Sequence, residues 1–506
     1  MSCRPQAWTL AAAATVAAAT QFTQSPLFKW KGVDPWTTFE AKTHIANLTP
    51  LEHYWPHARG RLGQYSQTDY NGPANLNESQ PAWTWHHPAG RYHTIVIGAP
   101  LIDHQKNLYL TSEDGIRKLD PDGNLLWYYQ GASDMVTCPS LCGATLFGNT
   151  HDGHVFAVNI ATGKEFWSIY PKPWNGVGSD VATFNCNDDG VLLMATDILM
   201  PGGGGNKRVL GFDAMKGSQM WEYALELPLM NFLPVFPDKD TFVIMDATGG
   251  VHRLDVHSGK PLWHEDVPDG SKRSFSVGGV SAGPNGDLYT CSNYLDSIGM
   301  VGQPGVVRRY SLETGQKQWE LPTDYPCNSW PVVSHDGRSV IVPTGAFASG
   351  PLSESGKGLT KDAQFKMHED AVLAGERGRS IMGLADLPGA ILVIDAEKGQ
   401  LQQDHQVKPY GGIAAAGDEE GYLERGQNHT RKTCGPPHWS APTISKDGTV
   451  FVGRVDGRLY AYHPERGVSS TYYTGTAPTH PGVSFAPGMM AYADCDSLYV
   501  FKVPES

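Results

Sequence analysis

The stretch Asp152-Gly-His-Val-Phe-Ala-Val-Asn159-Ile-Ala-Thr-Gly163-Lys-Glu-Phe-Trp167 decides the fold of this chain. Alternating apolar residues up to Asn159 predict a β-strand, Gly163 supplies the positive φ of a tight hairpin turn, and Trp167 opens the next strand. The same unit returns further along the chain, with glycine four residues and tryptophan eight residues after the first polar residue of the turn. These copies begin at Asp213, Asp255 and Ser311.

Three weaker copies complete the set. Asp120 to Trp127 is one residue shorter, whereas Asp395 to Gly399 and His463 to Gly467 keep the glycine and lose the tryptophan. A single Asp-x-x-x-Gly hairpin is common in proteins, but a tryptophan at the same offset in several copies is not. Repeats of about 40 residues with strand-turn-strand content are typical of β-propellers.

This pattern resembles the pyrroloquinoline-quinone (PQQ)-type repeat of the quinoprotein β-propeller family, and the resemblance covers residues 81 to 506. It implies that the glycine turn and the tryptophan dock neighbouring blades. We expect an all-β, eight-bladed propeller. The strand around Trp83-Thr-Trp85 is predicted to join the last three strands of the chain, so that the N-terminal strand closes the ring and leaves no exposed edge.

The chain divides into three predicted parts. Residues 1–20 contain one Arg followed by an alanine-rich apolar run, which is typical of a secretory signal peptide and too short to span a bilayer. An organellar transit segment is the alternative, so we expect a secreted or lumenal protein, or else an organellar one. Residues 21–80 form an N-terminal extension lying over one face or edge of the propeller, which occupies residues 81–506. No other stretch reaches transmembrane length.

The amino-acid composition and net charge limit the kinds of partner that the protein is expected to bind. The chain has 506 residues, 57 Gly, 36 Pro and 18% charged residues, which is typical of a turn-rich β protein. Its net charge of −13 and its lack of a Lys/Arg run argue against nucleic acid binding. We expect a monomer. Among eight cysteines, Cys138 and Cys142 are the one close pair and a candidate for a local disulfide in an exported protein.

Insertions into a regular ring are the expected place for function, and the larger ones fall in predicted blades three, five and six. In addition, the residues just before each innermost strand are expected to face the central funnel. They are Thr137, Asp180, Asn231, Arg273, Asn328, Trp330, His438, Trp439 and His480.

Two interpretations of this funnel set remain open. The set could hold a planar, anionic cofactor, with Arg273 paired to a carboxylate and Trp330 or Trp439 stacked on its ring. Alternatively, the tryptophans fill the channel and the polar groups satisfy the ends of the strands.

The resemblance to quinoprotein dehydrogenases indicates which residues a cofactor site would use. Those enzymes bind calcium and the quinone through a Glu, an Asn and an Asp, and they use an Asp as the base. By this resemblance Asn293 would contact the metal and the cofactor, and Asp296 would be the catalytic residue. However, the chain has no Cys-Cys dipeptide and no Cys-x-x-Cys-His haem motif. The stretch Ala195 to Pro201, which corresponds to the part of those enzymes that carries the calcium-binding Glu, contains no Glu.

We therefore predict a non-catalytic PQQ-like repeat propeller that serves as a binding or assembly scaffold, similar to the bacterial outer-membrane assembly lipoproteins of this family. A protein partner or a small ligand would bind at the mouth of the funnel, and no cofactor is expected. The alternative is an alcohol or sugar dehydrogenase that depends on PQQ and Ca²⁺ and has a divergent active site.

Overall fold

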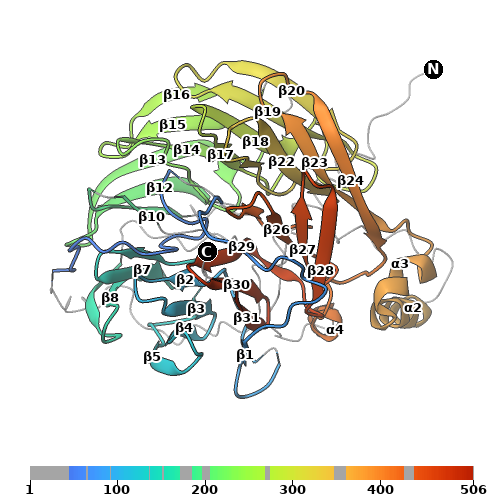
Figure 1. The fold of residues 1–506 in the computed structure, drawn as a ribbon, viewed down its shortest axis with the longest axis horizontal. Helices are drawn as coiled ribbons and strands as arrows, with labels where there is room; N and C mark the ends of the chain where they lie inside the picture. Colours follow the sequence, from blue (N-terminus) through green and yellow to red (C-terminus); the bar gives the residue numbers. More distant parts are fainter. Residues whose placement is uncertain are drawn as a thin grey trace.

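The structure is a computed structural model. It describes residues 45–63, 66–91, 93–135, 137–150, 153–170, 185–187, 189–196, 206–267, 274–346, 361–426 and 438–504. Eight antiparallel sheets follow one another around a ring in chain order (Figure 1). The predicted all-β, eight-bladed propeller is confirmed.

The first four blades run from the innermost to the outermost strand in sequence order. Blade one contains β2 (Leu101–Ile102), β3 (Leu108–Ser112), β4 (Gly115–Leu119) and β5 (Leu125–Tyr129). Blade two contains β6 (Ser140–Cys142), β7 (Thr145–Asn149), β8 (Val155–Asn159) and β9 (Glu165–Ile169). Blade three contains β10 (Asn185–Cys186), β11 (Val191–Thr196), β12 (Asn206–Asp213) and β13 (Ser218–Leu229). Blade four contains β14 (Thr241–Met245), β15 (Val251–Asp255) and β16 (Pro261–Glu265), with Val235 bridging to Val243 on its inner side.

The remaining blades repeat this order. Blade five contains β17 (Val280–Ala282), β18 (Asp287–Asn293), β19 (Gly305–Ser311) and β20 (Lys317–Thr323). Blade six contains β21 (Val332–Val333), β22 (Ser339–Gly345), β23 (Leu387–Asp395) and β24 (Leu401–Tyr410). Blade seven contains β25 (Thr443–Ile444), β26 (Val450–Arg454), β27 (Arg458–His463) and β28 (Val468–Tyr473). Blade eight contains β29 (Pro478–Ala486), β30 (Met489–Asp494) and β31 (Ser497–Lys502), and β1 (Trp83–His86) pairs with β31 as its outermost strand.

Tryptophans connect six of the eight blades to the blade that follows. Each one stacks on the turn glycine of the following blade and donates its indole N–H to a backbone carbonyl beside that turn. The six pairs are Trp83 to Pro121 (3.0 Å), Trp127 to Ile160 (3.0 Å), Trp167 to Ala214 (3.2 Å), Trp221 to Val256 (2.9 Å), Trp263 to Leu312 (2.9 Å) and Trp319 to Ala396 (3.0 Å). The repeat therefore encodes the interface between blades as well as the hairpin itself.

The two faces of the ring differ. Because neighbouring strands are antiparallel, the loops from second to third strand and the loops to the next blade emerge on one face. We call it the insertion face, since it carries α2 (Lys361–Leu373), η2 (Gly375–Arg377), α3 (Gly378–Ile381) and α4 (Glu419–Gly426). Of these, α2 lies in the insertion between the second and third strands of blade six. The opposite face carries the Asp-x-x-x-Gly turns, and we call it the turn face.

An N-terminal strap, formed by the described residues between 45 and 80, runs across the turn face. Trp55 bridges to Ile102 in blade one, and the Ala46 N–H donates to the Met215 carbonyl in blade three. Gln67 bridges to Ile444 in blade seven. The blue segment in Figure 1 follows this path across the ring. The strap thus ties together blades that are far apart in sequence.

Arg59 anchors the strap in the ring. Its side chain is buried and donates to the Val280 carbonyl at 2.9 Å, to Ser281 Oγ at 2.6 Å and to the Pro331 carbonyl at 3.2 Å. Its Nε also donates to Ser66 Oγ within the strap at 2.9 Å. A buried guanidinium is tolerated because its N–H donors find acceptors.

Within the described residues, two disulfides join neighbouring blades. Cys142 pairs with Cys186, and Cys291 pairs with Cys327. The predicted local pair of Cys138 and Cys142 is wrong, because Cys142 lies at the end of β6 facing blade three and Cys138 is buried as a free thiol. Among the described residues, no helix has the length and apolar character needed to cross a membrane.

Candidate functional site: the insertion face

Loops of the insertion face in blades five to eight share one apolar cluster. It draws on blades six, seven and eight and on the segment that precedes blade one, and Val301 from the β18–β19 loop of blade five packs against it. Its buried members are Ile95, Ala346, Leu387, Tyr410, Ala415, Ala416, Val455, Ala477 and Cys495. Loops that pack together in this way form a continuous surface layer instead of independent excursions.

Asn293, the residue expected to contact metal and cofactor, lies at the end of β18 and is 1% exposed. Its amide nitrogen donates to the Phe275 carbonyl at 2.6 Å and to Asn328 Oδ1 at 3.0 Å. Its amide oxygen accepts the backbone N–H of Cys327 at 2.9 Å. The side chain thus connects the β18–β19 loop of blade five to the start of blade six.

Asp296, the expected catalytic carboxylate, is on the same loop as Asn293 but is exposed to solvent. Asn293 is buried, so the structure places the two side chains in different environments. Arg273 and Asp180, which sequence reasoning placed at the funnel, lie outside the described residues.

Trp330 and Trp439 are both 1% exposed, and their surroundings are filled. Trp330 borders a cavity of about 10 Å³ that Asn231 and Gly279 also line, which is room for about one water molecule. Trp439 donates its indole N–H to the Thr344 carbonyl at 2.9 Å.

The ring of Trp439 has two further neighbours. The guanidinium carbon of Arg454 lies 5.3 Å from its centroid, and the ring of Tyr460 meets it edge-on at 5.2 Å. Arg454 was missed by sequence reasoning, because nothing in the repeat distinguishes it from an ordinary strand residue.

Arg454 also fixes the state of His438. The Arg454 Nε–H donates to His438 Nε2 at 3.0 Å, and His438 Nδ1 lies 2.5 Å from the Ala346 carbonyl. Complete burial, followed by the charge of Arg454, holds the pKa of His438 well below 6.5. The imidazole is therefore neutral, donates from Nδ1 and accepts at Nε2. Arg454 in turn forms an ion pair with Asp456 at 3.0 Å.

Polar side chains near the inner strands join neighbouring blades. Asn231 Nδ2 donates to the Val277 carbonyl at 3.1 Å, from blade four to blade five. Ser276 Oγ donates to the Cys327 carbonyl at 2.7 Å, from blade five to blade six. Burial lowers the pKa of His480, another member of the funnel set, to about 4, so this imidazole is also neutral. These contacts satisfy strand ends that would otherwise be buried without partners.

The arrangement can be compared with what PQQ and Ca²⁺ require. A calcium ion needs several oxygen ligands, and a quinone needs an accessible flat surface on which to stack. The Asn293 oxygen is engaged by a backbone N–H, and Trp330 and Trp439 are enclosed by protein. In this structure the three side chains make their contacts within the ring. Their assignment to a quinone site stays a prediction.

Comparison with known proteins follows this geometry. The sequence model of a PQQ-repeat family described as outer membrane protein assembly factor BamB matches residues 64–171 and 151–402, which is more than half of the chain. The chain belongs to this family. Propellers of the BamB family with solved structures share its fold. BamB from Moraxella catarrhalis superposes with a TM-score of 0.54 at 15% identity, covering 84% of this chain and all of that one.

Enzymes share the same fold. Quinohemoprotein alcohol dehydrogenase from Comamonas testosteroni superposes with a TM-score of 0.55 at 14% identity, covering 98% of this chain and 86% of that one. A tetrathionate hydrolase from Acidithiobacillus ferrooxidans is 23% identical over 233 residues, and the match spans 42% of each chain. Since the fold hosts both an assembly factor and enzymes, function has to be argued from the site.

Proposed function

We propose that this BamB-family propeller is a non-catalytic scaffold that binds a partner protein on its insertion face. The observation that carries the proposal is the state of Asn293. Asn293 is the side chain expected to contact both metal and quinone. Its amide instead forms hydrogen bonds that connect blades five and six. A residue used in this way holds two neighbouring blades together.

The insertion face has the features of a protein-binding surface. Large apolar side chains on its loops are exposed: Leu295 by 51%, Leu373 by 56% and Ile381 by 48%. Leu295 lies on the β18–β19 loop, whereas Leu373 and Ile381 lie on the insertion of blade six. The helices beneath them are held by a small core of their own around Ala371, Val372 and Ile413. Apolar side chains exposed on ordered loops are available for contact with a partner protein.

We infer that the scaffold works in an oxidising compartment. Both disulfides that join neighbouring blades, Cys142–Cys186 and Cys291–Cys327, require such an environment to form and persist. This supports export of the chain, in agreement with the signal peptide predicted for residues 1–20.

Affinity capture with two matched variants tests the proposal. Leu373→Asp places a charge on the insertion face, and Leu126→Asp places the same charge on outer strand β5, where Leu126 is 52% exposed. We expect proteins captured by the wild type from the native source to be retained by Leu126→Asp and lost with Leu373→Asp. Equal retention by both variants would contradict binding at the insertion face.

A further inference from the structure

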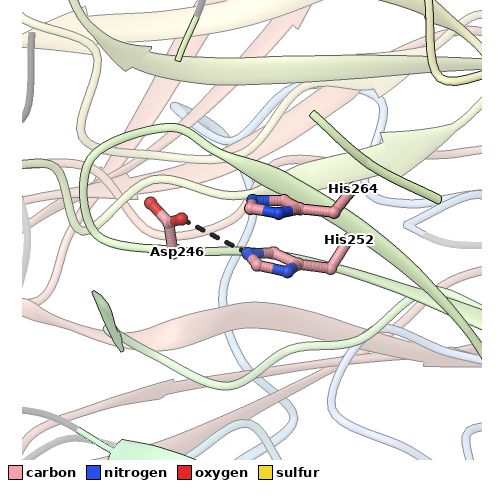
Figure 2. A group of neighbouring side chains, drawn as sticks. All are labelled: Asp246, His252 and His264. Atoms are coloured by element: carbon pink, nitrogen blue, oxygen red, sulfur yellow. Dashed lines mark hydrogen bonds and ion pairs between the residues drawn. The ribbon is translucent and has the colours of Figure 1, made fainter. Parts of the chain in front are cut away.

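Blade four brings one carboxylate and two imidazoles together near the insertion face. Asp246 follows β14 directly, His252 lies on β15 and His264 lies on β16. His252 and His264 are direct cross-strand neighbours, so their side chains project from the same side of the sheet. Figure 2 shows the two rings one above the other, with the carboxylate of Asp246 at their edge.

The side chains of Asp246, His252 and His264 lie close to one another. The two imidazole rings are stacked, with centroids 4.0 Å apart and planes within 9° of parallel. His252 Nε2 lies 3.3 Å from Asp246 Oδ2. One donor atom from each of the three residues falls within 4.8 Å of the other two.

Surrounding groups hold the carboxylate in place. Asp246 Oδ1 accepts the Thr248 N–H at 2.8 Å, the Thr248 hydroxyl at 2.8 Å and the Gly250 N–H at 3.1 Å. Oδ2 is left to face the imidazoles. Because three donors engage only one oxygen, the carboxylate is oriented toward the histidines before any ligand arrives.

A second group orients His252. The Tyr223 hydroxyl lies 3.1 Å from its Nδ1, which directs Nε2 toward Asp246. Outer partners of this kind fix the tautomer and ring orientation of histidines that bind metals. His252 and Asp246 are buried, whereas His264 is exposed, so the cluster opens to solvent on one side.

We propose that Asp246, His252 and His264 form a binding site for a divalent transition metal ion, with Zn²⁺ as the preferred occupant. Two imidazoles and one carboxylate are a typical zinc ligand set, with a fourth position left for water. Ligands at about 2.0–2.1 Å from a tetrahedral ion are separated by about 3.3 Å. That separation is already present between His252 Nε2 and Asp246 Oδ2.

A metal lies in the plane of each imidazole that binds it, so the exposed His264 ring has to turn out of the stack with His252 to complete the set from the solvent side. The exposed carboxylate of Asp266 lies 3.5 Å from His264 Nε2 and adds an oxygen donor at the entrance. The site belongs to one blade and is independent of the proposed scaffold function.

A second cluster in the described part of the chain provides a contrast. Asp189, Asp240 and His257 also place donor atoms within 4.8 Å of one another, but all three are exposed, and Lys239 already pairs with Asp240 at 3.0 Å. This cluster lies among turn-face loops and lacks the buried, oriented carboxylate of the first. We do not propose it as a site, and it supplies a matched control.

Titration of the tag-free, EDTA-treated full chain with ZnCl₂ by calorimetry tests the proposal, with Co²⁺ as a spectroscopic probe. We expect one saturable site, visible absorption typical of tetrahedral Co²⁺, and at least tenfold weaker binding in His264→Ala. Tyr223→Phe is expected to weaken binding by about 10-fold to 100-fold, as for other outer partners of metal ligands. His257→Ala is expected to bind as the wild type does.

A folding defect is not expected to explain weaker Zn²⁺ binding by His264→Ala. His264 is exposed, so its removal leaves the core intact, and circular dichroism verifies the fold of each variant. Two outcomes would overturn the proposal. One is a wild type that binds no Zn²⁺ at micromolar concentrations. The other is binding that His264→Ala keeps unchanged, which would leave Asp246 and His252 as an ordinary hydrogen-bonded pair.

Discussion

Gly259→Ala is the sharpest test of how the blades are held together. Gly259 has φ +67°, and a Cβ at this position would lie 2.4 Å from Cε3 and 2.6 Å from Cδ2 of Trp221. An alanine in this left-handed conformation costs about 1–2 kcal/mol. Displacing the tightly packed indole adds about 1–3 kcal/mol, so the free energy of unfolding should fall by about 2–5 kcal/mol.

Gly467→Ala is the matched control. Gly467 occupies the same position in the turn of blade seven with φ +60°, but a Cβ there meets no atom within 4 Å. Only the conformational cost of about 1–2 kcal/mol applies. Urea unfolding followed by tryptophan fluorescence measures both variants against the wild type. Losses that agree within about 0.5 kcal/mol would refute the idea that the indole contact, and not the turn alone, carries the interface.

Three other changes have defined outcomes. Asn293→Ala should lower the free energy of unfolding by about 2–4 kcal/mol in urea, because it leaves buried backbone groups without partners. Arg59→Ala should detach the N-terminal strap, so that limited proteolysis cleaves the strap before the ring, whereas in the wild type both resist cleavage alike. Asp494 is fully buried and its folded pKa is raised to about 7, so the carboxyl costs stability progressively as pH rises from about 4 to 7. The free energy of unfolding of Asp494→Asn should therefore rise relative to that of the wild type by up to about 4 kcal/mol over that pH range. Urea titrations at each pH measure this difference, and a difference that stays constant with pH would contradict the prediction.

The fold could be predicted from the sequence because its signal is local. Gly163 and Trp167 are four residues apart, and each repeat carries its own turn and its own docking residue. The place of Trp127 on the turn of blade two follows from that repetition. The path of the strap could not be predicted in the same way. Arg59 finds its acceptors at Val280 and Pro331, and no periodic pattern links residues so far apart in sequence.

The candidate site was harder to predict because its contacts are not local. Asn293 was recognised from its neighbours in sequence, yet its role depends on Phe275, Asn328 and Cys327 in adjoining segments. The same limit applies to the cysteines, where closeness in sequence suggested the pair Cys138 and Cys142, whereas Cys142 pairs with Cys186 in the next blade. The spacing of His252 and His264 shows nothing unusual until the hairpin register places them side by side.

A thermal melt of the purified chain with and without PQQ and Ca²⁺ tests the central claim most directly. A ligand that binds only the folded state stabilises it by about 2.7 kcal/mol at 100 times its dissociation constant. The scaffold proposal predicts no change in melting temperature at saturating PQQ and Ca²⁺. A rise that depends on PQQ concentration and disappears in Asn293→Ala would contradict it and favour a dehydrogenase.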